Sequence, residues 1–273
     1  MGRSQSNNIA TIPHVSIAGE SMKADLKQLE ELLGLNFWKN KSVSDIVLYL
    51  TQTREPYRAG VLADPLSYFN YLDLKPGMRV LDAGCGTGFN AEMLAKTGLS
   101  PPLIVHACDS NADLINYCNG SFFSMYGYLN NTNYVPHSAP IVYRVAELTS
   151  LPYPNEYFDR ILVSFVLQHI ESKDIGRVFY QLNRVLKQGG LVAIIDTDWS
   201  SVTGIDDEID NINELEDFLS DNIPSWNIAS FRKISVYFKE YEFELVSHSS
   251  IQQIIDKYSV YTYRYVLRKH KYD

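Results

Sequence analysis

Between residues 75 and 199, short apolar runs alternate with amphipathic segments. The apolar runs, rich in valine, leucine and isoleucine, occupy 79–83, 103–109, 141–145, 159–164 and 191–196. Runs of this length and composition predict β-strands. The segment 174–187 instead spaces its apolar residues three and four apart, which predicts an amphipathic helix ended by the sequence QGG. Shorter helices are predicted over 90–96 and from about Ala112.

Strands that alternate with helices predict a mostly parallel sheet with helices on its faces. Two further strands are predicted at 242–250 and 260–269, the second because tyrosines alternate there with more polar residues. Ligands of such sheets bind beyond the carboxyl ends of the strands. A glycine-rich turn, Asp109 and Ser164 all stand at predicted carboxyl ends. We therefore expect the functional site at that edge.

The pattern also divides the chain into regions. We predict that residues 1–20 are a flexible tail and that 21–74 form an N-terminal helical cap, because leucines recur at helical spacing from Leu26. Residues 75–273 are the predicted core. Within it, 199–225 is acidic and helical in pattern, which predicts either a solvated helix face or a lid-like insertion.

Composition narrows the classes of function. The chain has 273 residues, a hydrophobic fraction of 45% and a net charge of -8. A negative charge argues against a nucleic-acid partner, and the absence of an apolar run of about 20 residues argues against a membrane span. Three cysteines fit no zinc spacing, so no metal is expected. The prediction is a cytoplasmic protein, and the oligomeric state is left open.

The turn in VLDAGCGTGFN determines which ligand to expect. Gly84, Gly86 and Gly88 are spaced G-x-G-x-G, and Phe89 stands where a dinucleotide-binding turn needs glycine or alanine. The Gly-Lys-Ser/Thr of a phosphate-binding loop is missing too. Asp82 places a carboxylate beside the turn, which attracts a cation and repels a pyrophosphate. The turn therefore favours a cationic nucleoside ligand, S-adenosyl-L-methionine, over the nicotinamide cofactor of an oxidoreductase.

Four further stretches follow in an order that is itself informative: HACDSN, YRVAELTSLPYPNEYFDRI, FVLQHI and LNRVLKQGGLVAIIDTDW. Together with the glycine turn they resemble the motifs of class I S-adenosylmethionine-dependent methyltransferases, most closely the ubiquinone/menaquinone-biosynthesis-like branch that acts on small molecules. The resemblance implies a Rossmann-like, doubly wound, seven-stranded α/β sheet, mostly parallel with an antiparallel last strand. It covers residues 68–199 well.

The resemblance also implies the residues that hold the cofactor. Asp109 corresponds to the acidic residue on the ribose hydroxyls, and Glu147 replaces the family's aspartate on the adenine amino group, while Gln188 replaces a proline. The full set implied to contact the cofactor is Asp82, Gly84, Cys85, Gly86, Thr87, Gly88, Asp109, Ser110, Glu147, Leu148, Ser164, Phe165 and His169. Asp82 and Asp109 can alternatively cap helices, and Cys85 can simply fill a tight turn.

The implied activity is methyl transfer to a small molecule by in-line displacement, which needs alignment and exclusion of water more than acid–base chemistry. Candidates for a catalytic group are His169, Tyr57 and Asp196. His169 can instead be bonded to the backbone, and Asp196 can cap a loop. The aromatic content of the cap and the acidic segment favour an aromatic or cationic acceptor. A catalytically idle cofactor-binding partner subunit and a protein methyltransferase remain alternatives.

Overall fold

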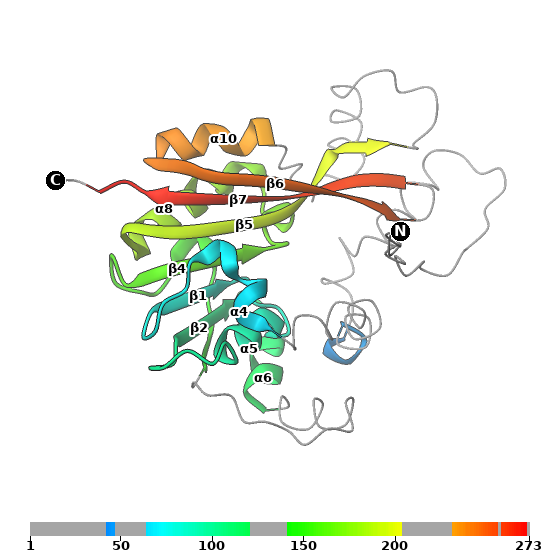
Figure 1. The fold of residues 1–273 in the computed structure, drawn as a ribbon. Helices are drawn as coiled ribbons and strands as arrows, with labels where there is room; N and C mark the ends of the chain where they lie inside the picture. Colours follow the sequence, from blue (N-terminus) through cyan, green and yellow to red (C-terminus); the bar gives the residue numbers. More distant parts are fainter. Residues whose placement is uncertain (1–41, 47–63, 121–140, 204–230, 256–257, 272–273) are drawn as a thin grey trace, which may run out of the picture.

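The computed structural model describes residues 42–46, 64–120, 141–203, 231–255 and 258–271. Its centre is a seven-stranded sheet with the strand order β3-β2-β1-β4-β5-β7-β6 (Figure 1). The predicted α/β class and mostly parallel sheet are confirmed. The helices predicted before residue 64, and Tyr57 with them, lie largely outside the described residues.

Five strands are parallel to one another and run in sequence order outward from β1 on either side. They are β1 (Arg79–Ala83), β2 (Ile104–Asp109), β3 (Ile141–Val145), β4 (Phe158–Ser164) and β5 (Leu186–Thr203). In register, Ala83 pairs with Val163, and Ser164 pairs with Ile195. The carboxyl ends of β1, β2 and β4 therefore meet at one edge of the sheet.

The last two strands extend the sheet beyond β5. β6 (Phe243–Ile255) forms the edge, and β7 (Tyr258–Lys269) inserts between β5 and β6, antiparallel to both. The antiparallel last strand is thus confirmed. The structure differs from the half-buried strand expected there, because Thr262 and Val266 are buried as well as Tyr263 and Tyr265. Both faces of the sheet are covered at β7.

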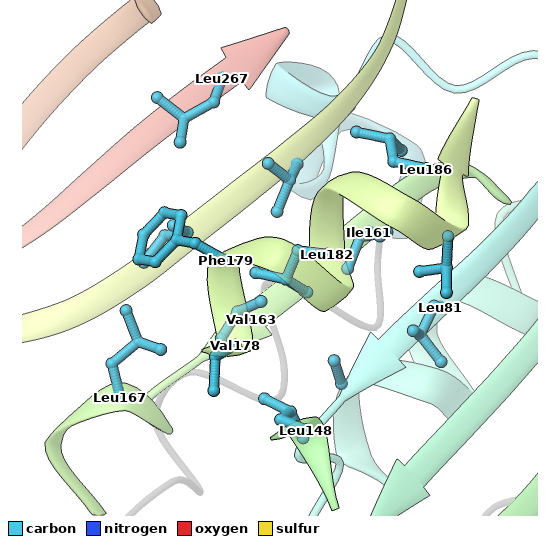
Figure 2. Close-up of a cluster of buried hydrophobic side chains, with 14 of the residues drawn as sticks. Leu81, Leu148, Ile161, Val163, Leu167, Val178, Phe179, Leu182, Leu186 and Leu267 are labelled. Carbon is cyan, nitrogen blue, oxygen red and sulfur yellow. The ribbon is translucent and has the colours of Figure 1, made fainter. Parts of the chain in front are cut away.

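One face carries the larger hydrophobic cluster. The helices α8 (Ile175–Val185) and α10 (Phe231–Glu240) contribute apolar side chains to this cluster. Figure 2 shows Val178, Phe179 and Leu182 of α8 in one buried cluster with Ile161 and Val163 of β4. Since these side chains are fully buried, this face anchors the sheet rather than offering a binding surface.

The opposite face carries α5 (Phe89–Ala95), α6 (Ala112–Gly120), the short helix α4 (Pro65–Tyr68) and the 3-10 turn η1 (Asn70–Leu72). Phe69 and Leu72 pack there with Val80, Leu162 and Ala193. The end of the predicted helical cap thus forms one short α-helix and one 3-10 turn. No helix of the described residues has the length and apolarity needed to cross a membrane.

The predicted lid-like segment begins within the sheet. Residues 199–203 continue β5, and Thr203 pairs with Ser259 of β7. Residues 204–225 lie outside the described part of the chain, so the lid stays a prediction.

Candidate functional site

The glycine turn connects β1 to α5 at the carboxyl edge of the sheet. Gly84, Gly86 and Gly88 all have positive φ angles, of 78°, 53° and 81°. A side chain is strained in this region, which explains why the turn uses glycine. The N–H groups of Gly84 and Cys85 donate to the Cys108 carbonyl of β2 at 2.8 and 2.9 Å. The turn is therefore tied to the neighbouring strand.

The three glycines have different surroundings. A Cβ atom at Gly84 would overlap the Val166 side chain, and one at Gly88 would lie 2.9 Å from the Tyr143 hydroxyl oxygen. At Gly86 a Cβ atom would meet nothing within 4 Å. Gly84 and Gly88 thus permit close packing of protein on protein. Gly86 instead borders open space at the carboxyl edge, where a ligand can approach the backbone.

Asp82 lies within β1 and is only 1% exposed. Its Oδ2 accepts a hydrogen bond of 3.0 Å from the N–H of Ala91, in the first turn of α5. A carboxylate at a helix N-terminus satisfies a free backbone donor and interacts favourably with the helix dipole. Of the two interpretations, the structure displays the helix cap. The carboxylate thus connects β1 to the start of α5, across the glycine turn.

Asp109 ends β2 and is half-buried beside the turn. Its Oδ2 accepts from the N–H of Gly86 at 2.9 Å, and its Oδ1 accepts from the N–H of Asn111 at 3.0 Å. Each carboxylate oxygen has a second lone-pair direction, so both can still accept from a ligand hydroxyl. The helix that follows is capped by Asn111, whose Oδ1 accepts from Asp113 at 2.9 Å. Asp109 thereby connects the glycine turn after β1 to the carboxyl end of β2.

The residues implied to lie around the nucleoside follow β2 and β3. Ser110 and Glu147 are exposed, whereas Leu148 is buried at the start of the turn η2 (Leu148–Ser150). Thr87 is half-buried in the glycine turn. Ser110, Glu147 and Thr87 therefore have surface available to a ligand at this edge.

The cysteine of the turn is not a nucleophile in this arrangement. Cys85 is 8% exposed and lies next to Cys118 of α6. A hydrogen bond with Cys118, together with burial, raises the pKa of the Cys85 thiol well above its ordinary value. The thiol therefore stays protonated at neutral pH and acts as a small filler of the turn.

The segment after β4 borders the same edge. Phe165 has a φ of 58°, unusual for a bulky residue, and its N–H donates to the Ile195 carbonyl of β5 at 2.7 Å. Val166, the next residue, packs against Gly84. Strained backbone of this kind persists where neighbouring elements hold it in place. The ends of β1, β4 and β5 are therefore packed together here.

Asp196 fixes this segment from β5. It is fully buried, and its oxygens accept from the N–H groups of Thr197 at 2.9 Å and Gln168 at 3.3 Å. Burial raises the pKa of this carboxyl to about 7, although the backbone hydrogen bonds oppose the shift. Of the two interpretations, the observed contacts are those of a residue that caps a loop.

His169 ends the short turn η3 (Leu167–His169) and is half-buried. Its ring Nε2 lies 3.3 Å from the Gln168 side-chain nitrogen, and its backbone N–H donates to the Val166 carbonyl at 2.9 Å. Ser164, at the end of β4, is also half-buried. Ser164 thus stands at the carboxyl end of β4, and His169 follows in the next turn. Within the described residues, no group of three or more histidine, cysteine or acidic side chains is placed to hold a metal.

Two residues near this edge were not singled out by sequence. Arg264 of β7 stacks on the ring of Tyr71 in η1, with its Cζ atom 4.3 Å from the ring centroid. Tyr71 reads as one of several aromatic residues in the cap, and Arg264 as a polar position of an alternating strand. The packing of η1 against the sheet brings them together, which no local sequence signal indicates.

Comparison with known proteins agrees with this geometry. Residues 81–194 match the family described as "Methyltransferase domain". The chain is 32% identical over 123 residues to the ubiquinone/menaquinone biosynthesis C-methyltransferase UbiE of Vibrio vulnificus, an alignment that covers 45% of this chain and 42% of the relative. The chain therefore matches less than half of the length of this relative.

Solved structures extend the likeness over more of the chain. A S-adenosylmethionine-dependent methyltransferase from Methanosarcina mazei has a TM-score of 0.57 at 15% identity, covering 75% of this chain and 97% of that one. Geranyl diphosphate C-methyltransferase from Streptomyces coelicolor, solved with S-adenosyl-L-homocysteine, has a TM-score of 0.51 at 12% identity, covering 74% and 76%. Motif order, glycine turn, strand order and family match agree: residues 81–194 are similar to a methyltransferase domain, and the sheet has the fold of S-adenosylmethionine-dependent methyltransferases.

Proposed function

We propose that this protein binds S-adenosyl-L-methionine at the carboxyl edge of β1, β2 and β4 and transfers its methyl group to a small-molecule acceptor. The observation that carries the proposal is the open space where a Gly86 Cβ atom would stand, at a residue whose N–H is bonded to the carboxylate of Asp109. A nucleoside there can come close to the backbone, and both oxygens of Asp109 can accept from ribose hydroxyls. The residues present thus fit the cofactor.

The cofactor supplies an electrophilic methyl group on a sulfonium, which leaves as a neutral thioether. The residues then have to align the acceptor with that methyl group and exclude water. Ser164 ends β4, His169 follows in η3, and both are half-buried, so we propose that they contact the acceptor or the methionine part of the cofactor. Asp196 is fully buried and accepts from the backbone N–H of Gln168, so we propose for it the role of holding this segment in place.

The relatives support a small molecule as the acceptor. The names of the curated UbiE relatives describe C-methyltransferases of ubiquinone and menaquinone biosynthesis, and the Streptomyces structure contains geranyl diphosphate. We propose an acceptor of comparable size for this chain and leave its aromatic or cationic character as a prediction. A cytoplasmic location is also a prediction.

Two alternative functions give different results. An idle partner subunit would bind the cofactor without transferring its methyl group, and a protein methyltransferase would transfer the methyl group to a polypeptide.

Substitution of Gly86 by alanine tests the cofactor site directly. The new methyl group enters the open space, so we expect the affinity for S-adenosylhomocysteine to fall about 10- to 100-fold, as for an overpacked contact. Isothermal titration with S-adenosylmethionine, S-adenosylhomocysteine and NAD measures the effect. Asp109→Ala is a less specific test, because it also removes the acceptor of the Gly86 N–H.

Gly98→Ala is the matched control. Gly98 also has a positive φ, of 70°, and a Cβ atom there would meet nothing within 4 Å, but Gly98 lies after α5 and away from the turn. Both alanines impose similar backbone strain, so only the Gly86 variant should lose the adenosyl ligands. Wild-type binding of NAD alone, or equal affinity in both variants, would contradict the proposed cofactor site. Transfer of labelled methyl from the bound cofactor to small-molecule or protein fractions then tests the activity.

A further inference from the structure

Three buried polar atoms of the described residues have no hydrogen-bond partner and lie on neighbouring elements. They are the hydroxyl oxygen of Tyr71, the Nε of Arg264 and the hydroxyl oxygen of Thr262. A buried donor without a partner destabilises the folded protein, because it has lost its hydrogen bonds to water. The three side chains share one property, the ability to donate a hydrogen bond, and the guanidinium can only donate. Together they form an unsatisfied donor set, named the Arg264 cluster below.

The sheet register places the Arg264 cluster at the carboxyl edge. Arg264 pairs with Ile195, which pairs with Ser164 at the end of β4, and Thr262 pairs with Thr197 further out. Residues two apart on a strand point to the same face, so Arg264 and Thr262 project together. Val266 lies on that face too and packs in the cluster that contains Phe69 and Leu72. This is the face on which η1 carries Tyr71.

Tyr71 is held in position by the sheet. The buried Arg160 of β4 donates from Nε to the carbonyl of Leu72 and from Nη2 to the carbonyl of Asp73 at 3.1 Å. The Tyr71 ring then lies under the Arg264 guanidinium at 4.3 Å, a cation–π contact that orients the cation. Burial raises the pKa of the Tyr71 phenol above its ordinary value, so the hydroxyl keeps its proton. The donors are therefore fixed before any ligand arrives.

The charge of the Arg264 cluster defines its ligand. Within the described part of the chain, no carboxylate forms an ion pair with Arg264. A planar guanidinium binds a carboxylate through two parallel hydrogen bonds, and such charge-assisted bonds are the strong ones. We propose that Arg264, Tyr71 and Thr262 form a subsite for a carboxylate group of the methyl acceptor. This inference rests on the proposed function, because it places the acceptor beside the cofactor.

The position of β7 favours the acceptor over the cofactor as the source of the carboxylate. In the strand order, β4 and β5 separate β7 from β1, so Arg264 lies three strand spacings, about 14 Å, from the glycine turn. The proposed nucleoside site extends from β1 toward β2, in the opposite direction. A group that reaches the Arg264 cluster therefore approaches the methyl group from the β5 and β7 side.

Acetate is the probe, because it is the smallest carboxylate that the subsite should accept and it needs no knowledge of the rest of the acceptor. We expect 100 mM acetate to raise the melting temperature of the S-adenosylhomocysteine-loaded protein by about 2 °C more than chloride or acetamide does, corresponding to a dissociation constant on the order of 10 mM. Arg264→Gln should raise that constant at least tenfold. Arg268→Gln, an exposed position on the same strand, should leave the acetate dissociation constant unchanged.

Further variants separate the remaining explanations. Tyr71→Phe and Thr262→Val each remove one hydroxyl with little change of shape, and each should weaken acetate binding several-fold even if Arg264→Gln does not fold. If none of the variants changes the acetate effect, ordered water satisfies these atoms and the proposal fails. If Arg264→Gln weakens S-adenosylhomocysteine as much as acetate, the cofactor's carboxylate occupies the site, which also overturns the proposal.

Failure of the proposed function gives a different result. Wild-type protein that binds neither adenosyl ligand refutes the cofactor site, and the acetate comparison is then repeated without S-adenosylhomocysteine. Acetate binding that depends on Arg264 would show that the carboxylate subsite exists, although its role beside a cofactor would be refuted. Its absence would refute both.

Discussion

At the residue scale, Gly88 shows how one missing side chain sets the geometry of the site. Its φ of 81° begins α5, and the position of its absent Cβ is crowded by the Tyr143 hydroxyl and by Cys118 Sγ at 3.1 Å. The left-handed conformation costs other residues about 1–2 kcal/mol. The contact with Tyr143 adds to that cost, because Tyr143 is itself held in the cluster that contains α5.

We expect Gly88→Ala to lower the free energy of unfolding by about 2–4 kcal/mol, the sum of backbone strain and overpacking. Gly98→Ala, with the strain alone, should lose about 1–2 kcal/mol. Urea denaturation of the two variants measures the difference. Equal losses would mean that Tyr143 and Cys118 move aside without cost.

At the element scale, the end of α8 depends on a residue of the last strand. The structure differs from the helix predicted over 174–187, because α8 ends at Val185 and β5 begins at Leu186. Lys269 of β7 is 7% exposed, and its Nζ donates to the carbonyls of Asn183 and Leu186 at 2.9 Å each. A cation at a helix C-terminus satisfies free carbonyl groups and complements the helix dipole.

Lys269→Met tests this tertiary cap. The variant keeps much of the apolar stem but leaves two carbonyl groups without their charged donor, so we expect a loss of about 2–3 kcal/mol in the free energy of unfolding. Arg268→Met is the matched control on the neighbouring residue, whose ion pair with Glu244 at 3.3 Å is exposed. An exposed pair contributes at most about 1 kcal/mol. Similar losses in both variants, measured by urea denaturation, would refute the cap.

At the scale of the whole molecule, two buried carboxyl groups make stability depend on pH. Burial raises the pKa of Glu92 on α5 and of Asp196 on β5 to about 7 each, and the pair of Glu92 with Lys96 at 3.7 Å offsets only part of the shift. In the unfolded chain both titrate near 4. The protonated form is therefore favoured by folding. Its contribution is complete below about pH 4 and is lost as the pH rises through 7.

Asp196→Asn isolates one of these groups, because asparagine is neutral at every pH. At pH 5 we expect the variant to be less stable by about 1–3 kcal/mol, since an amide nitrogen replaces one of the oxygens that accept from Thr197 and Gln168. As the pH rises to 8, the difference from wild type should shrink. Urea denaturation across this range gives the difference directly, and so cancels groups such as His106, whose pKa burial lowers. A difference that is constant with pH would contradict the raised pKa.

Much of the sheet could be predicted because each strand carries its own signal. The predicted limits of β1 and β3 agree with the observed ones, and those of β2 and β4 differ by one residue at their starts. The last strands were predicted too short. β5, β6 and β7 lengthen one another by ladder pairing, which is a property of three strands and not of any one sequence.

The sequence by itself determined the local features of the site: the glycine turn, Asp109 at a strand end, and the order of the motifs. These features depend on backbone conformation and on neighbours a few residues away, so they are written in short stretches of chain. Only the tertiary structure decided that Asp196 caps a loop, that Lys269 ends α8, and that Arg264 lies over Tyr71. Each of these contacts joins residues that are 28 or more positions apart, and the packing of a helix or turn against a strand of the sheet brings them within hydrogen-bonding or stacking distance.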